Sequence, residues 1–238
     1  MLNLTIKLLA AFLLFGGTAA AQSKIYLEPR LGFGTFRMSS LKELQQTVIS
    51  NSGVSSKAVD TYNPYIQFGL GVVKEMDENT AIGLLLERGS TGGRVAYEDY
   101  SGELLFDTPV HYNAIGAMIY THNAIATSNL EFVAGVELNV FLSQLKTETY
   151  ARLYDATETD EDKFNSKGIG LKPYMGLQYP AFNLPLKLTV GYMASASQAF
   201  HVPGEKKQYL VRNSNSDKLE PGWSGLRLNL TVSVPVFN

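Results

Sequence analysis

Residues 225–236 read GLRLNLTVSVPV, and in this stretch apolar residues occupy every second position. Successive side chains of a β-strand point to opposite faces of the sheet, so this alternation predicts a strand with one apolar and one polar face. The apolar face holds Leu226, Leu228, Leu230, Val232, Val234 and Val236, and the polar face holds Arg227, Asn229, Thr231 and Ser233.

Seven earlier segments carry the same alternation, although both faces are mixed in 110–120. These segments are 25–35, 62–73, 80–88, 110–120, 129–143, 168–179 and 186–195. The sequence therefore predicts eight strands of about 10–13 residues, which suits tilted membrane-crossing strands that need roughly 9–11.

The connections between these segments alternate between long and short. The long ones are 37–61, 89–109, 146–167 and 200–223, and the short ones are 74–80, 121–128 and 180–185. Such alternation is typical of an outer-membrane barrel with long outer loops and short periplasmic turns. We therefore predict an all-β, eight-stranded antiparallel transmembrane β-barrel.

A soluble eight-stranded barrel of the lipocalin kind is the alternative, because there the apolar face lines a ligand pocket. Its solvated outer face would carry many Lys and Glu residues. Here the polar face is mostly Gly, Asn, Gln, Ser and Thr with isolated charges. This composition favours the transmembrane barrel.

The N-terminus has the pattern of a signal peptide. Lys7 precedes an apolar run over 8–15, and small residues stand at 19–21. That run is too short for a membrane-spanning helix, which needs roughly 20 residues. We expect cleavage after Ala21, so that residues 22–238 form the barrel domain.

Composition excludes several function classes. The chain has 20 basic and 22 acidic residues, a balance that gives no reason to expect a nucleic-acid partner. It has no Cys, which excludes disulfides, Cys-ligated metals and a thiol nucleophile. The acidic segment 155–162 lacks the spacing and central Gly of an EF-hand, so we expect a solvated loop, no metal site and no cofactor.

If the apolar face meets lipid, eight charged residues point into the lumen: Glu28, Arg30, Glu87, Glu131, Glu137, Lys172, Lys187 and Arg227. The interior of an eight-stranded barrel is just wide enough to be filled by side chains, and buried charges require partners. We expect a salt-bridge network that fills the barrel, with a narrow solute path as the alternative.

Two further sets are expected at the membrane boundary. Cations at the outer rim, which suit lipid phosphates or nearby carboxylates, are Arg37, Arg88, Arg94 and Arg212. Aromatic residues near strand ends, where amphipathic rings favour the membrane interface, are Tyr62, Tyr120, Tyr179, Phe200 and Trp223. The chain's expected partners are outer-membrane lipid and an unidentified protein or surface ligand at the long loops, with the barrel itself a monomer.

No catalytic constellation is evident. His111 and His201 have no Ser at the two-residue spacing that would put both on one face of a strand, and His122 lies at a predicted periplasmic turn. Asp107 precedes His111 by four residues, which would suit the orienting carboxylate of a triad. We expect no enzyme activity, with a lipid-modifying enzyme as the remaining alternative.

The first long loop carries a helix signal. Residues 40–43 read SLKE, a capping-box pattern, and Leu44 and Val48 follow at helical spacing. We expect a short amphipathic helix over roughly 41–50. It would lie over the barrel mouth or on the outer leaflet, or pack on neighbouring loops.

The mature chain resembles the PorT-like outer membrane protein β-barrel family. The resemblance rests on the signal, the eight-strand layout, and motifs in two loops, STGGR at 90–94 with YEDYSGE at 97–103 and SSLKEL at 39–44. It implies a link to protein secretion or outer-membrane assembly and no catalytic residue. The leading expectation is a non-enzymatic barrel with a structural or surface-interaction role, and the alternative is an accessory to secretion or solute passage.

Overall fold

The computed structural model describes residues 24–100, 102–126, 128–181, 184–205, 208–211 and 217–237. The expected signal peptide and Arg212 lie outside these residues. The elements are β1 (Ile25–Gly34), α2 (Ser39–Asn51), β2 (Lys57–Thr61), β3 (Tyr65–Glu75), β4 (Thr80–Thr91), β5 (Gly93–Glu98), β6 (Gly102–Asp107), β7 (Val110–Ala124), β8 (Glu131–Leu153), β9 (Ala156–Ala181), β10 (Leu184–Ser197), β11 (Gly225–Val232) and β12 (Val234–Phe237).

Eight of these strands close into an antiparallel barrel, which confirms the predicted fold class. Around the ring the order is β1, β3, β4, β7, β8, β9, β10 and β11, and β11 pairs with β1. All eight predicted segments correspond to strands of this ring. Closure matters because the edge of an open sheet has backbone groups that lipid cannot satisfy.

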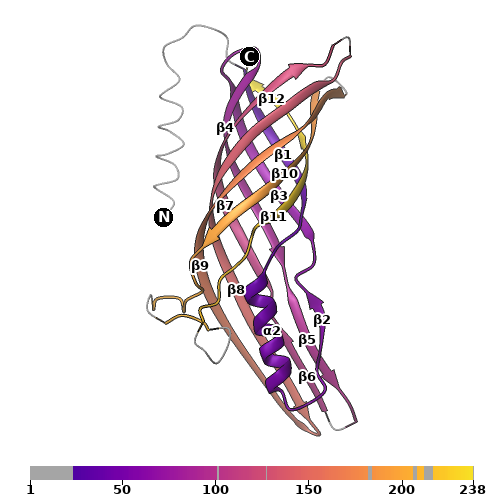
Figure 1. The fold of residues 1–238 in the computed structure, drawn as a ribbon, viewed down its shortest axis with the longest axis vertical. Coiled ribbons are helices and arrows are strands. Elements are labelled where there is room, and N and C mark those ends of the chain that lie inside the picture. The colour runs from indigo at the N-terminus through magenta and orange to yellow at the C-terminus, as the bar shows by residue number, and fades with distance from the viewer. Residues whose placement is uncertain are drawn as a thin grey trace.

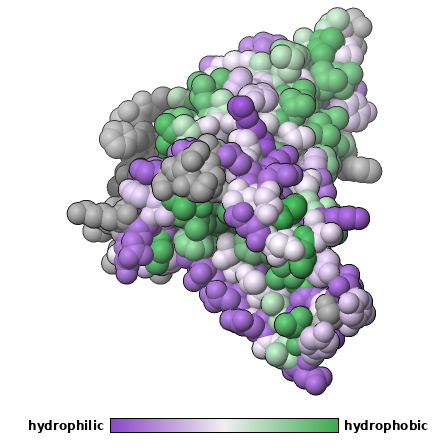
Figure 2. Space-filling model, turned by 60° about the horizontal axis from the view of Figure 1, so that its bottom comes forward, coloured by the Kyte–Doolittle hydropathy of each residue, from purple (hydrophilic) through white to green (hydrophobic). Residues whose placement is uncertain are grey.

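The outward face of the barrel is apolar. Along β8 the exposed residues include Val136, Leu138, Val140 and Leu142, and similar rows run along the neighbouring strands. Figure 2 shows hydrophobic surface on the wall at the upper right of the view and hydrophilic surface in the lower part. A polar interior inside an apolar belt is the arrangement of a transmembrane barrel. No helix among the described residues is long and apolar enough to cross a membrane.

Three expected outer loops contain β-strands that the sequence did not predict. β8 has 23 residues and β9 has 26, and they pair continuously from Glu131 and Gln178 out to Leu153 and Ala156. β6 adds to β8, β5 to β6 and β2 to β5. The expected loops 37–61, 89–109 and 146–167 therefore form a β-sheet extension of the barrel wall (Figure 1).

This extension lies at the end of the molecule opposite β12 (Figure 1). The sequence does not predict these strands, because most of their length borders neither lipid nor a packed interior. Their residues therefore need not alternate between apolar and polar. Residues 156–163 of β9 are all exposed and mostly polar, so no alternation marks them. Hydrogen bonding to a neighbouring strand holds them extended instead.

The helix of the first loop spans Ser39–Asn51, slightly more than the predicted 41–50. The expected capping box is wrong, because the N-cap is Met38 in a left-handed conformation and no side chain caps the helix. Leu41 and Gln45 form its buried face, and Gln45 Nε2 donates to the Asp60 carbonyl of β2 at 2.9 Å. The helix thus packs on β2 and β5, as the loop-packing alternative expected, and its Leu41 also joins the buried cluster over the barrel mouth, as the mouth alternative expected.

We predict that Leu138→Arg lowers the free energy of unfolding by about 2–4 kcal/mol, the cost of an arginine near the bilayer midplane on the lipid face. Leu138 is 57% exposed and lies in the middle of the apolar row of β8. Urea unfolding in lipid vesicles measures the change.

The matched control is Gln144→Arg, on the same strand and face but beyond the apolar row. It should leave the unfolding free energy nearly unchanged. Equal effects of the two substitutions would contradict the assignment of the outward face to lipid.

Candidate functional site

Seven of the eight predicted lumen charges are buried inside the barrel: Glu28, Arg30, Glu87, Glu137, Lys172, Lys187 and Arg227. The eighth, Glu131, is partly exposed at the periplasmic end of β8. There its Oε2 lies 3.0 Å from His122 Nδ1 and accepts a hydrogen bond from Gln178 Nε2 at 2.6 Å. The structure thus places Glu131 at the entrance of the lumen and the other seven within it.

The middle of the lumen is crossed by an ionic clamp on Glu137 of β8. Its Oε1 lies 2.7 Å from Arg30 Nη1 of β1, and its Oε2 lies 2.7 Å from Lys172 Nζ of β9. Lys172 is the cross-strand neighbour of Glu137, whereas β1 stands four strands away around the ring in either direction. The Arg30–Glu137 pair therefore joins opposite walls through the lumen.

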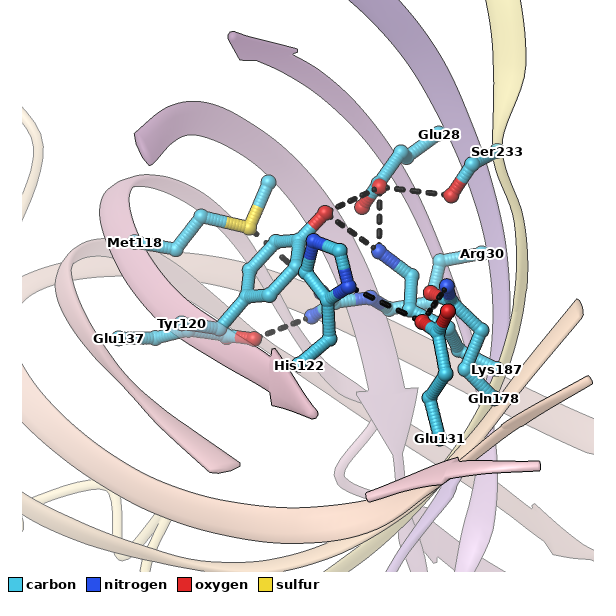
Figure 3. Close-up of polar contacts among 10 residues, drawn as sticks. All are labelled: Glu28, Arg30, Met118, Tyr120, His122, Glu131, Glu137, Gln178, Lys187 and Ser233. Carbon is cyan, nitrogen blue, oxygen red and sulfur yellow. Dashed lines mark hydrogen bonds and ion pairs between the residues drawn. The ribbon is translucent and has the colours of Figure 1, made fainter. Parts of the chain in front are cut away.

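A second cluster lies nearer the periplasmic end, around Glu28 of β1 (Figure 3). Its Oε1 accepts hydrogen bonds from Tyr120 at 3.0 Å, from Ser233 at 2.8 Å and from Lys187. The Lys187 ammonium also donates to the Tyr120 hydroxyl at 2.9 Å and lies 4.1 Å from the centre of its ring. These side chains come from both sides of β1 and close the lumen at this level.

A third cluster lies nearer the outer end and is built mainly from neutral groups. The Tyr112 hydroxyl lies 2.7 Å from Glu87 Oε1 and 3.1 Å from Gln67 Oε1, and Gln67 Nε2 donates to Asn229 Oδ1 at 3.0 Å. Among the described residues, no basic group lies within 4 Å of the Glu87 carboxylate. Tyr112 takes the place that the predicted network gave to a cation.

Arg227 of β11 lies at the outer end of the polar interior. Its guanidinium donates to the backbone carbonyls of Thr35 and Leu226, and to that of Trp223 at 2.5 Å. It also lies over the ring of Phe36, 4.7 Å from the ring centre. Arg227 therefore binds the chain segments that cover the mouth instead of a carboxylate.

Above this level, a buried apolar cluster covers the outer mouth. Trp223 is at its centre, with its ring 5.4 Å from Phe36 and 4.5 Å from Tyr112, and its indole N–H donates to Ser143 Oγ at 2.8 Å. The other buried members are Met38, Leu41, Tyr62, Val110, Ala114, Phe141, Leu145, Phe164, Met193, Phe200 and Leu219. We call this set the mouth plug.

Four of the five expected interface aromatics are therefore placed wrongly by the sequence. Tyr62, Phe200 and Trp223 belong to the mouth plug, and Tyr120 points into the lumen. The three rings of the mouth plug exclude water from the outer end, whereas Tyr120 fills the lumen nearer the periplasm, and the polar groups of Tyr62, Tyr120 and Trp223 each have a partner inside. Tyr179 alone is exposed on the outer wall.

Glycine on the inward face makes room for this packing. A Cβ at Gly89 would lie 2.5 Å from the ring of Tyr112, and a Cβ at Gly32 would lie 2.5 Å from the side chain of Gln67. The glycine-rich polar face of the strands therefore belongs to a lumen packed with long side chains.

The expected rim cations do not form one group. Arg37 and Arg88 are exposed. Arg94 binds Asp107 through two hydrogen bonds of 2.6 Å across β5 and β6, and this pairing raises the pKa of the guanidinium. Arg94 thus belongs to the extension and is already engaged.

The ion pair between Arg94 and Asp107 also excludes Asp107 as the orienting carboxylate of a catalytic triad with His111. Both oxygens of Asp107 are bound by Arg94, so Asp107 does not orient His111. Ser90 is the cross-strand neighbour of His111, a relation that a search within one strand cannot find. The described residues contain no group of three or more His, Asp and Glu side chains that would hold a metal ion.

Tyr112 and Tyr120 are the lumen residues that sequence reasoning missed. Both lie in β7, the segment whose two faces are mixed, because its inward face carries the apolar residues Ala114 and Met118 between the two tyrosines. An even number of positions separates Tyr112 from Tyr120, so both side chains lie on the face of β7 that also holds Ala114 and Met118. This spacing could have predicted that both tyrosines point into the lumen.

Comparison with known proteins finds no matching family model and no matching curated protein. Among solved structures, the outer membrane protein OprG from Pseudomonas aeruginosa is similar with a TM-score of 0.38 and 10% identity, over 92% of this chain and 97% of that chain. Ail, the attachment invasion locus protein of Yersinia pestis, is similar in a complex with the heparin analogue sucrose octasulfate, with a TM-score of 0.30 and 12% identity over 90% of this chain and 100% of that chain.

We predict that Glu137→Gln lowers the free energy of unfolding by about 3–5 kcal/mol, because it leaves Arg30 and Lys172 buried without a counter-charge. Urea unfolding of the purified barrel measures the loss. The control is Glu161→Gln, since Glu161 pairs with Lys146 and Lys163 on the exposed extension and its loss should leave stability unchanged. A Glu137→Gln barrel as stable as the original would show that the clamp does not hold the lumen together.

Proposed function

We propose that this chain is a non-enzymatic outer-membrane protein whose filled barrel serves as a rigid stem for the β-sheet extension, and that the extension contacts a protein or surface ligand outside the cell. The observation that carries this proposal is the length of β8 and β9. At 23 and 26 residues they exceed by a dozen or more the roughly 9–11 needed to cross a membrane.

The contents of the lumen support a stem and not a channel. The Glu137 clamp crosses it, the Glu28 cluster fills it nearer the periplasm, and the mouth plug covers the outer end. Each of these layers joins strands from different parts of the ring. Opening a path would require breaking buried ion pairs together with aromatic packing.

The extension has two different faces. Its outer face carries exposed ion pairs, in which Lys146 lies 2.6 Å from Glu148 and 2.8 Å from Glu161. Hydrogen bonds from Lys146 and Lys163 hold the pKa of Glu161 below its usual value, so this face stays charged in neutral solution. A solvated face of this kind keeps the extension soluble above the membrane.

The inner face of the extension has a cavity of about 650 Å³ beyond the C-terminal end of α2. It is lined by Ser52, Val54, Tyr97, Gly102, Glu103, Leu104, Ala151, Arg152, Leu153, Ala156, Thr157 and Glu158. Val54 and Leu153 are exposed apolar residues within it. Clustered apolar side chains on an otherwise polar extension are typical of a contact surface.

The motif that carries the resemblance to the PorT-like family lies in the same region, at the end of β4 and along β5 and β6. We include membership of that family in the proposal. We also propose that residues 1–21 direct export and are removed after Ala21, and that the barrel stands in the outer membrane as a monomer.

We predict that a photo-crosslinking amino acid at Leu153 forms a discrete adduct with one surface component on intact cells. The reason is that Leu153 is exposed within the cavity. Immunoblotting after irradiation detects the adduct, and Leu104→Glu should abolish it by charging the cavity lining.

The control position is Met76, an exposed residue at a short periplasmic turn. It should give no adduct of the same size. An adduct at Leu153 that survives Leu104→Glu, or no adduct at Leu153, would contradict a contact surface in the cavity.

We also predict that the purified protein in planar lipid bilayers gives no steady conductance steps, because the clamp and the mouth plug fill the lumen. Trp223→Ala, which removes the centre of the plug, is the comparison and should still not conduct while the Glu137 clamp remains. Regular steps from the unmodified protein would favour solute passage instead.

A further inference from the structure

We propose that the outer wall at β9 and β10, together with the neighbouring residues 198–201, 208–211 and 217–220, binds an outer-leaflet lipid with a phosphorylated headgroup. The site has two adjoining parts, a cationic cavity above and an apolar groove below. The proposal rests on the outer-membrane location proposed above but not on the contact surface of the extension.

The upper cavity has a volume of about 560 Å³. It is lined by Lys167, Gln198, Ala199, His201, Tyr209, Lys218 and Glu220. Among the described residues, no carboxylate lies within 4 Å of the Lys167 or Lys218 ammonium, and Lys218 lies 4.3 Å from the centre of the Tyr209 ring. Lys167 and Lys218 form no ion pair with another described residue, and Glu220 is the one acidic residue in the lining given above, so these described residues make the cavity net positive.

The lower groove has a volume of about 400 Å³ and shares Lys167 and Gln198 with the upper cavity. Its other lining residues are Val140, Gly168, Ile169, Ala196 and Ser197. Val140 and Ile169 are exposed members of the lipid-facing belt. These two residues are direct cross-strand neighbours, and the small residues Gly168, Ala196 and Ser197 beside Ile169 leave a recess in the wall that a hydrocarbon chain fits.

The depth of the site matches the membrane boundary. Lys167 is exposed on β9 two residues beyond Ile169, about 7 Å further along the strand. His201 continues the same sheet, since its backbone exchanges hydrogen bonds with that of Asn165 of β9 at 2.9 and 3.0 Å. Lys167 is also the cross-strand neighbour of Leu142, the last exposed residue of the apolar row of β8, so it stands where the apolar belt ends.

The order of the two parts identifies the occupant. A phosphate in the upper cavity would accept charge-assisted hydrogen bonds from Lys167 and Lys218, and the acyl chain attached to it would run down the groove. Free phosphate would use the cavity alone. Because the groove opens from the cavity through shared residues, the lining suits one molecule that is anionic at one end and apolar at the other.

The test measures binding of diphosphorylated lipid A to the purified mature barrel in detergent micelles by native mass spectrometry. Lys167→Glu with Lys218→Glu should weaken binding at least about tenfold, and Ala196→Trp, which fills the groove, should weaken it comparably. Glu220→Gln should tighten it. Lipid A without its phosphates should bind the unmodified barrel as weakly as phosphorylated lipid binds the double variant.

Lys163→Glu is the matched control, since Lys163 is exposed on the same strand and face but lies outside both cavities. It should bind like the unmodified barrel, and every variant should keep the different gel mobility of boiled and unboiled protein that marks a folded barrel. Should the charge-reversed double variant not assemble, Lys167→Gln with Lys218→Gln takes its place.

Three results would overturn the proposal. The first is unchanged lipid binding by an assembled double variant. The second is displacement of the lipid by millimolar inorganic phosphate together with no effect of Ala196→Trp. The third is that Lys163→Glu weakens lipid binding as much as the double variant does. None of them bears on the conductance or crosslinking results, so this site and the proposed function fail separately.

Discussion

The structure depends most on the ion pair between Arg30 and Glu137, because it joins two strands on opposite sides of the ring. A charged side chain buried in a barrel that is surrounded by lipid has no access to bulk water, so it must find a counter-charge inside. Glu137 also binds Lys172 on the next strand. One carboxylate therefore links β1, β8 and β9 across the lumen.

The remaining interior follows from that constraint. The Tyr112 hydroxyl reaches the Glu87 carboxylate, which has no basic group within 4 Å among the described residues, and Gly89 leaves space for the Tyr112 ring. Trp223 and its neighbours then cover the outer end. With its interior packed, the protein presents its distinctive chemistry on its outside, namely the extension and the outer wall.

The extension and the wall face different surroundings and carry different side chains. The extension has ion pairs on one face and an apolar cavity on the other, which suits contact with a macromolecule in water. The wall near Lys167 has cations directly above an apolar groove, which suits a lipid at the membrane boundary. Both positions follow from strands that pass through the membrane and continue beyond it.

Sequence alone determined the eight barrel strands and the seven inward charges, because lipid on one side and a packed lumen on the other impose a period of two on residues such as 225–236. Only the tertiary structure decided which charges meet, since Arg30 and Glu137 are 107 positions apart and their contact requires ring closure. It also decided that Tyr62, Tyr120, Phe200 and Trp223 point inward. The local sequence around an aromatic residue at a strand end is the same whether the ring faces lipid or covers the barrel mouth. The direction of the ring depends on the space that the side chains of the other strands leave inside the barrel.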